Sequence, residues 1–211
     1  MKGFVVIESE TELDVVAVYT AAGRDGQVET LHTERVPARS RKAGAREVCV
    51  IFEPPLTVGT QYGTPAGQHS GDVIFTSNGV VVSVHAFAFA GGGGTFNLAR
   101  VESMPVLNAS QTRRMNNINL GFDYVAIGFV PTRAQFEFLD QGGSENLSVN
   151  GSAVFAGDIS AVPATLGGAT VAVSTTAAPG DKKGIVTLTG AINNSMARGQ
   201  EFWIDNVCAM E

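Results

Sequence analysis

Short runs of β-branched and aromatic residues, separated by turn-forming residues, occupy most of this 211-residue sequence. Runs of this kind favour pleated strands, and Gly, Pro, Asn and Asp between them supply the backbone conformations of tight turns. No convincing helical pattern lies between the runs, although the sequence allows a helical turn around Asp158–Ala161. The pattern therefore predicts antiparallel sheets, packed as a β-sandwich of jelly-roll type. The predicted strands are Val48–Phe52, Asp72–Phe75, Val80–Phe89, Phe96–Val101, Ile118–Phe122, Gln135–Leu139, Leu147–Val149, Thr170–Thr175, Gly184–Leu188 and Phe202–Val207.

Composition narrows the classes of function. Hydrophobic residues make up 44% of the chain, which is enough for one medium β-domain with an appendage. The formal charge is -6 with only 14 Lys plus Arg, so we expect no nucleic-acid partner. No apolar run approaches the roughly 20 residues that span a bilayer, so we expect no membrane insertion. Met1 opens directly into a strand-like segment, so an export signal, if there is one, would lie upstream of this sequence.

The chain is predicted to have three parts. Residues 1–38 form an extension, in which Phe4–Ile7 and Leu13–Tyr19 read as a hairpin and Val28–Val36 as a third strand. Three strands cannot close a sandwich, so this sheet is expected to need a packing partner. Residues 39–46 carry several basic residues and read as a solvated linker, and residues 47–211 form the sandwich. Cys49 and Cys208 lie near the two ends of that domain, and the pattern leaves their pairing open.

Local signatures of enzymes are missing from the sequence. There is no G-x-S-x-G, H-E-x-x-H, phosphate-binding loop or C-x-x-C. The histidines lie on separate segments without the spacing of metal ligands. Carboxylates offer the other route to hydrolysis, because glycosidases use two such groups on either side of the scissile bond. The candidates in F-E-F-L-D-Q-G-G-S-E-N-L are Glu137, Asp140 and Glu145, for which turn capping is the simpler interpretation.

Aromatic and loop residues suggest a binding surface instead. Sugar rings present apolar C–H faces that stack on aromatic rings, and Tyr62, Tyr124 and Trp203 are candidates for that role. Trp203 belongs to the run F-W-I-D, in which one of the two alternating faces must be core. His69 lies in the polar loop G-Q-H-S-G, where it could contact a ligand.

Two stretches resemble families that we recognise. The segment K-G-F-V-V-I-E-S, with E-L-D-V-V-A-V-Y-T-A and L-H-T-E-R-V-P, is similar to the closing strands of a domain in bacterial exported proteins. The second stretch covers about 165 residues, with V-I-F-E-P-P-L-T-V-G-T-Q-Y-G, N-N-I-N-L-G-F-D-Y and G-Q-E-F-W-I-D-N-V-C. It resembles bacterial secreted domains of unknown function and, more distantly, the galactose-binding jelly rolls of carbohydrate-binding modules.

The second resemblance implies two structural features. Carbohydrate-binding jelly rolls often hold a structural calcium where the first strand meets the last, and the matching oxygen donors here are Glu53, Gly59, Thr60 and Asp205. First and last strands are neighbours in such folds, so the resemblance also implies a disulfide between Cys49 and Cys208.

Three hypotheses of function follow. The first is a non-catalytic extracellular or cell-surface module that binds glycan or a surface protein. The second is a structural protein that forms homo-oligomers when its N-terminal strands join a neighbour's sheet. The third is a glycan hydrolase or lyase that uses Glu145 or His69.

Overall fold

The computed structural model describes residues 15–22, 28–36, 46–50, 52, 54–92, 95–96, 98–103, 114–117, 119–178 and 181–211. It divides the chain into two compact units, residues 1–45 and 46–211. In the first unit, β1 (Val15–Ala22) pairs with β2 (Val28–Val36) in an antiparallel two-stranded sheet. The predicted strand Phe4–Ile7 lies outside the described residues, as does the predicted linker apart from Arg46.

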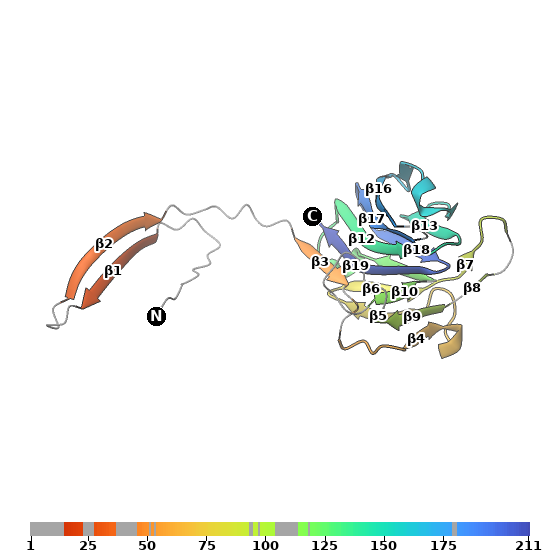
Figure 1. The fold of residues 1–211 in the computed structure, drawn as a ribbon, viewed down its shortest axis with the longest axis horizontal. Coiled ribbons are helices and arrows are strands. Elements are labelled where there is room, and N and C mark those ends of the chain that lie inside the picture. The colour runs from red at the N-terminus through yellow and green to blue at the C-terminus, as the bar shows by residue number, and fades with distance from the viewer. Residues whose placement is uncertain are drawn as a thin grey trace. The chain divides into compact units, whose positions relative to one another are not determined.

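The described part of the second unit is built from antiparallel strands, which confirms the predicted all-β class (Figure 1). One sheet has nine strands, in the order β15-β16-β17-β12-β19-β10-β9-β4, with β3 also paired to β19. A second sheet has six strands, in the order β14-β13-β18-β11-β6-β5, and β7 pairs with β8 apart from both. The jelly-roll connectivity of these sheets stays a prediction.

The strands of the nine-stranded sheet are β3 (Glu47–Val50), β4 (Gln61–Gly63), β9 (Leu98–Glu102), β10 (Arg114–Asn117), β12 (Arg133–Asp140), β15 (Thr165–Leu166), β16 (Ala169–Ala178), β17 (Asp181–Thr189) and β19 (Phe202–Met210). Those of the six-stranded sheet are β5 (Val73–Ser77), β6 (Val80–Val84), β11 (Leu120–Asp123), β13 (Glu145–Val149), β14 (Phe155–Gly157) and β18 (Asn194–Gly199). The separate pair is β7 (Phe87–Ala88) and β8 (Thr95–Phe96).

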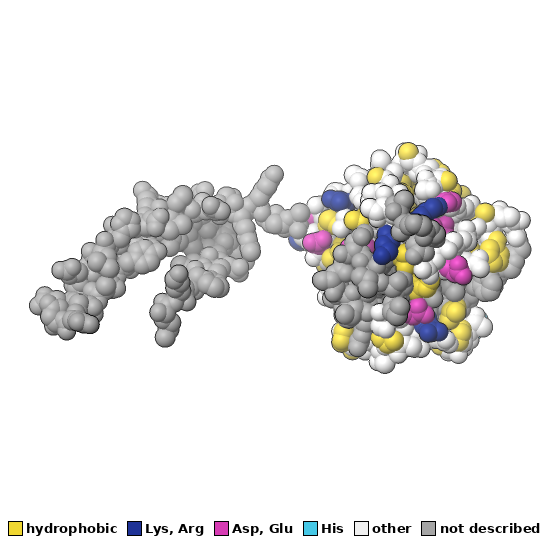
Figure 2. Space-filling model, viewed as in Figure 1, with side chains coloured by type: hydrophobic (Ala, Val, Ile, Leu, Met, Phe, Trp, Pro, Cys, Tyr) yellow, Lys and Arg dark blue, Asp and Glu magenta, His cyan; other side chains and the backbone are white. Residues whose placement is uncertain are grey.

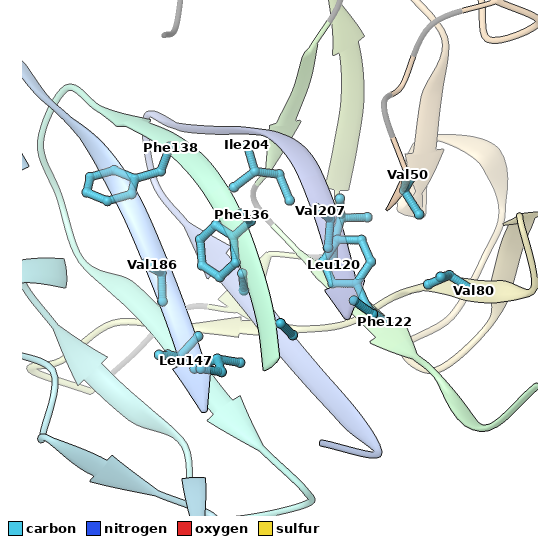
Figure 3. Close-up of a cluster of buried hydrophobic side chains, with 14 of the residues drawn as sticks. Val50, Val80, Leu120, Phe122, Phe136, Phe138, Leu147, Val186, Ile204 and Val207 are labelled. Atoms are coloured by element: carbon cyan, nitrogen blue, oxygen red, sulfur yellow. The ribbon is translucent and has the colours of Figure 1, made fainter. Parts of the chain in front are cut away.

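The two large sheets share one hydrophobic core. Alternate residues of β6 are fully buried, as the period of two in a strand requires. Figure 3 shows side chains from both sheets in this core, where the rings of Phe138 and Phe202 stack with centroids 5.7 Å apart. Each large side chain that is fully buried stabilises the fold by roughly 1.5–3 kcal/mol. The side chains labelled in Figure 3 are Val50, Val80, Leu120, Phe122, Phe136, Phe138, Leu147, Val186, Ile204 and Val207.

The turns and short helices follow local chemistry. Asn78 and Gly79 join β5 to β6 with φ angles of 51° and 84°, and this Asn-Gly turn matches the twist of a hairpin. The predicted helical turn is confirmed as the 3-10 helix η3 (Ile159–Ala161), which Asp158 caps by accepting a hydrogen bond from the Ser160 amide. The other 3-10 helices are η1 (Thr64–Ala66) and η2 (Val125–Ile127). Within the described residues, every helix is too short or too polar to cross a membrane.

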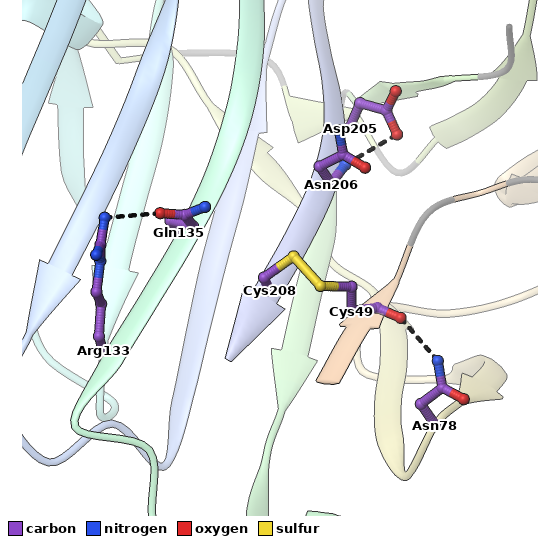
Figure 4. Close-up of a disulfide and its surroundings, with 7 residues drawn as sticks. All are labelled: Cys49, Asn78, Arg133, Gln135, Asp205, Asn206 and Cys208. Carbon is purple, nitrogen blue, oxygen red and sulfur yellow. Dashed lines mark hydrogen bonds between the residues drawn. A yellow bond between two sulfur atoms is a disulfide. The ribbon is translucent and has the colours of Figure 1, made fainter. Parts of the chain in front are cut away.

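A disulfide joins the first and last strands of the second unit (Figure 4). Cys49 of β3 lies directly opposite Cys208 of β19, and the two Cα atoms are 4.1 Å apart. The pairing implied by the resemblance is therefore present. The Asn78 side chain donates a hydrogen bond to the Cys49 carbonyl, so the β5–β6 turn also holds β3.

Arg46, the last residue of the predicted linker, is held by the second unit. Its guanidinium bonds both carboxylate oxygens of Glu211 at 2.6 Å and donates to the Gly128 carbonyl at 3.0 Å. It also lies over the Phe129 ring, 5.0 Å from the centroid. These contacts place the start of the sandwich beside the last residue of the sequence.

Candidate functional site

The structure separates the residues that sequence reasoning proposed for ligand stacking. Tyr124 is only 1% exposed, because its ring belongs to the core and its hydroxyl bonds the Ser195 hydroxyl at 2.9 Å. Its role is therefore packing, and burial raises its pKa to about 12. Trp203 lies on the opposite face of β19 from the buried Phe202 and Ile204, and its indole N–H donates to Glu102 at 2.7 Å.

The other two proposed ligand residues lie elsewhere. Tyr62 packs against Phe75, with ring centroids 6.0 Å apart, and partial burial raises its pKa. His69 is exposed, and its ring lies 3.7 Å from the Asp72 carboxylate. These residues sit on separate elements of the fold, so together they do not form one stacking platform.

The predicted calcium ligands can be placed only in part, because Glu53 lies outside the described residues. Gly59 donates its amide to the Val101 carbonyl, and the Thr60 carbonyl accepts from the Val101 amide, so this segment pairs with β9. Asp205 is fully buried, and one carboxylate oxygen accepts from the Asn206 amide. The calcium site stays a prediction.

The carboxylates considered for hydrolysis lie around the β12–β13 connection. Glu145 is fully buried and accepts a hydrogen bond from the Ile159 amide, while its other carboxyl oxygen has no hydrogen-bond partner. Burial, reinforced by the nearby charge of Asp140, raises the pKa of Glu145 to about 8. Neither of the two hollows described below is lined by Glu145.

Polar side chains instead converge on the outer face of the six-stranded sheet. The alternating core residues of β6, β11 and β18 point inward, so the residues between them point outward. They surround a hollow of about 210 Å³. We call this hollow and its lining the outer-face site, and the residues that define it are Ser83, His85, Gly121, Asp123, Asn194 and Met196.

Gly121 forms the floor of the outer-face site. A Cβ atom at this position would lie 2.5 Å from His85 Nε2, 2.7 Å from its Cδ2 and 3.1 Å from Ser83 Oγ. The absence of a side chain therefore lets the imidazole lie directly over β11. Ser83 also lies opposite Gly121 across the β6–β11 pairing.

His85 lies in surroundings that favour its neutral form, which suits hydroxyl recognition. Its Nε2 atom lies 2.8 Å from Ser83 Oγ. Partial burial, followed by the positive charge of Arg198, lowers the pKa of the imidazole. A neutral imidazole has one donor and one acceptor nitrogen, so it can exchange both kinds of hydrogen bond with a sugar hydroxyl.

The rest of the outer-face site combines acceptors with one apolar side chain. Asp123 is exposed and uses one carboxylate oxygen to accept the Val125 amide. Asn194 lies opposite Asp123, and its side-chain oxygen accepts from the Gly151 amide at 3.2 Å. Met196 lies opposite Gly121 and supplies a polarisable thioether. A small polar hollow with one apolar contact suits a hydroxyl-rich ring more than a wholly apolar ligand.

A second hollow, of about 320 Å³, is more apolar and lies over η2 and the loop that follows it. Its rim includes Val125 and Val130, which are 74% and 59% exposed. Few polar side chains converge on it, so it offers less basis for specific recognition than the outer-face site. On the face shown in Figure 2, the described acidic and basic side chains are interspersed and form no extended patch of one charge.

Sequence reasoning missed the outer-face site because it looked for aromatic residues. The signal that could have found it is the set of residues that alternate with core residues along these strands. Ser83 and His85 alternate with buried valines, and Gly121 and Asp123 flank buried Phe122. That alternation predicts a shared outer face once the strands are known to be neighbours. The pairing of β11 with both β6 and β18 could not be read from the sequence.

Comparisons of the chain with protein-family models, with curated proteins and with solved structures found no match.

Proposed function

We propose that the protein is a non-catalytic extracellular module that binds glycan through the outer-face site. The observation that carries this proposal is the convergence of hydrogen-bonding side chains from three neighbouring strands around the open floor at Gly121. The hollow is smaller than the roughly 300–1,000 Å³ of pockets that enclose a whole drug-sized ligand. It therefore fits one sugar ring, with the rest of the glycan lying along the sheet.

The chemistry of the site supports binding more than turnover. Ser83 and His85 are within hydrogen-bond distance, as a nucleophile and a base would be. The described lining of the hollow, however, contains no Lys, no Arg and no helix N-terminus that could stabilise an oxyanion. The same two groups serve recognition directly, because a hydroxyl and a neutral imidazole each donate and accept hydrogen bonds.

A single added methyl group tests the proposal. In Gly121→Ala, the new Cβ would occupy space now filled by the His85 ring, so the imidazole must move off β11. Affinity electrophoresis first identifies the polysaccharides that bind the full chain. For these, we expect the affinity measured by calorimetry to fall at least tenfold in the variant. We expect a change of only a few degrees in the unfolding midpoint, because the displaced atoms belong to the end of a side chain.

Gly91→Ala is the matched control, because a Cβ atom at Gly91 meets nothing within 4 Å. It should leave both affinity and stability unchanged. Equal affinity of Gly121→Ala and the unsubstituted chain would remove the outer-face site from the proposal.

The alternative function is self-assembly through the N-terminal unit. In the described residues, β1 and β2 pair only with each other, and a two-stranded sheet is at best marginally stable in water. Free strand edges invite pairing with another chain. If assembly is the function, the full chain should form larger species in sedimentation experiments as its concentration rises, and deletion of residues 1–38 should abolish them. A monomer at all concentrations, with or without the deletion, would exclude this alternative.

A further inference from the structure

Next to the outer-face site, β18 carries a buried arginine that has no acidic partner among the described residues. Arg198 follows Met196 by two residues, so it lies on the same face of the sheet and about 7 Å further along it. Arg198 is only 8% exposed, and one terminal nitrogen, Nη1, donates to the Ala86 carbonyl. The other two nitrogens, Nε and Nη2, are buried and have no hydrogen-bond partner.

The unpaired nitrogens have a defined geometry. Nε–H and one Nη2–H point the same way in the guanidinium plane, which is the edge that receives the two oxygens of a carboxylate. An arginine side chain stays charged in proteins even where burial lowers its pKa, as it does here. A buried charge without a counter-charge is unfavourable, so the fold leaves at this point a cation that an oxyanion would stabilise.

The neighbours of Arg198 add hydrogen-bond donors rather than negative charge. Asn119 precedes β11 and is fully buried, and neither atom of its side-chain amide has a partner. The Ser148 hydroxyl on β13 is also buried and unpaired. Glu145, the buried carboxyl on the neighbouring strand β13, is one residue before Asn146, which pairs with Arg198, so it points to the opposite face.

A short segment covers the arginine. Ala86 accepts from Arg198, and the Ala88 amide and carbonyl both bond the Asn146 side chain, at 2.9 and 2.8 Å. The strand β7 in this segment has two residues and, among the described strands, pairs with the two-residue β8 outside both large sheets (Figure 1). A ladder this short adds little stability, so the main cost of opening the cover is exposure of the fully buried Phe87 ring, roughly 1.5–3 kcal/mol.

We propose that Arg198 binds the carboxylate of an acidic sugar whose ring lies in the outer-face site, with the segment from Ala86 to Ala88 giving way as the ligand enters. This inference rests on the proposed function and names its ligand class as glycans that contain uronic acids. The carboxylate would take the Nε and Nη2 edge, and Asn119 and Ser148 would supply further donors. The exposed Asp123 does not oppose this arrangement. It lies opposite Asn194, four residues from Arg198 on β18, which is about 13 Å away.

The test compares two ligands with the same sugar rings, one charged and one neutral. Polygalacturonate carries a carboxylate on each ring, and its fully methyl-esterified form carries none. The full chain should bind polygalacturonate at least tenfold more tightly, even though its formal charge of -6 disfavours polyanions in general. Arg198→Met should lose this preference and bind both polymers as the unsubstituted chain binds the ester. Arg133→Met, at an exposed arginine paired with Gln135, is the control and should keep the preference.

The outcomes separate this inference from the proposed function. Binding of both polymers with equal affinity, lost in Gly121→Ala, would overturn the role of Arg198 and leave glycan binding intact. Binding of neither polymer, nor of any neutral polysaccharide, would overturn the proposed function itself. If Arg198→Met does not fold, the unsubstituted protein still decides: sodium galacturonate should shift the Arg198 Nε–H resonance in NMR spectra, and an unmoved resonance at saturation would refute the proposal.

Discussion

Reduction of the Cys49–Cys208 disulfide is expected to lower the free energy of unfolding by about 5 kcal/mol. The bond closes a loop with a sequence separation of 159 residues, and the chain-entropy model gives that magnitude for so long a loop. It also fastens β3, which has four residues and pairs with β19 at its end. Urea titrations with and without a reductant measure the difference. A loss below about 1 kcal/mol would show that the unfolded chain is hardly constrained by the bond.

The double substitution Cys49→Ala/Cys208→Ala is the matched control for the reductant. It removes the bond without leaving thiols, so its stability should equal that of the reduced protein within about 1 kcal/mol, with a small further contribution from lost packing at Cys208. It should also be insensitive to the reductant. Any remaining effect of the reductant on this variant would mean that the first experiment measured something other than the disulfide.

Glu145→Gln is expected to remove most of a stability loss that the unsubstituted protein suffers between about pH 5 and pH 8. Burial, with help from Asp140, raises the pKa of Glu145 to about 8 in the folded protein, against an ordinary value of 4.5. The folded state therefore holds a proton that the unfolded state releases across this range. Stability is full below pH 4.5 and falls as pH rises through the folded pKa, by at most ~1.4 kcal/mol per pH unit.

The glutamine keeps the acceptor for the Ile159 amide and does not titrate, so urea midpoints of the variant should depend less on pH across this window. Between pH 5 and pH 8, the free energy of unfolding should fall by several kcal/mol more in the unsubstituted protein than in the variant. Glu211→Gln is the control, because Glu211 is exposed and its pairing with Arg46 lowers its pKa, which keeps its titration below the window. Parallel pH profiles for the Glu145→Gln variant and the unsubstituted protein would show that Glu145 ionises normally in the fold.

The sequence predicted the fold where a strand carries its own signal. Val80–Val84 and Arg133–Asp140 are rich in β-branched or aromatic residues and alternate in burial. The predicted run Gln135–Leu139 became β12 close to its expected bounds, whereas the predicted run Val80–Phe89 divides into β6, which ends at Val84, and the short β7. Strand β18 was missed because N-S-M-A-R-G has low β propensity. It is held by pairing with β11 on one side and β13 on the other, a tertiary effect that a local pattern does not contain.

The candidate site was harder to predict for the same reason. Trp203 and Tyr124 attracted attention as aromatic residues, but one contacts Glu102 and the other fills the core. Gly121 looks unremarkable in the sequence, and its importance comes from the His85 ring that lies over it. The disulfide was easier, because the resemblance to jelly rolls implies that the strands carrying Cys49 and Cys208 are neighbours.

The central claim is that glycan binds over Gly121 on the outer face of the six-stranded sheet. The most direct test is an NMR titration of the isotope-labelled full chain with a pool of neutral and acidic oligosaccharides. The account predicts that saturable shifts gather at the outer-face site, in the amides of Ser83, His85, Gly121, Asp123 and Met196. Shifts that gather instead around Trp203 or Val130, or no shifts at all, would contradict it.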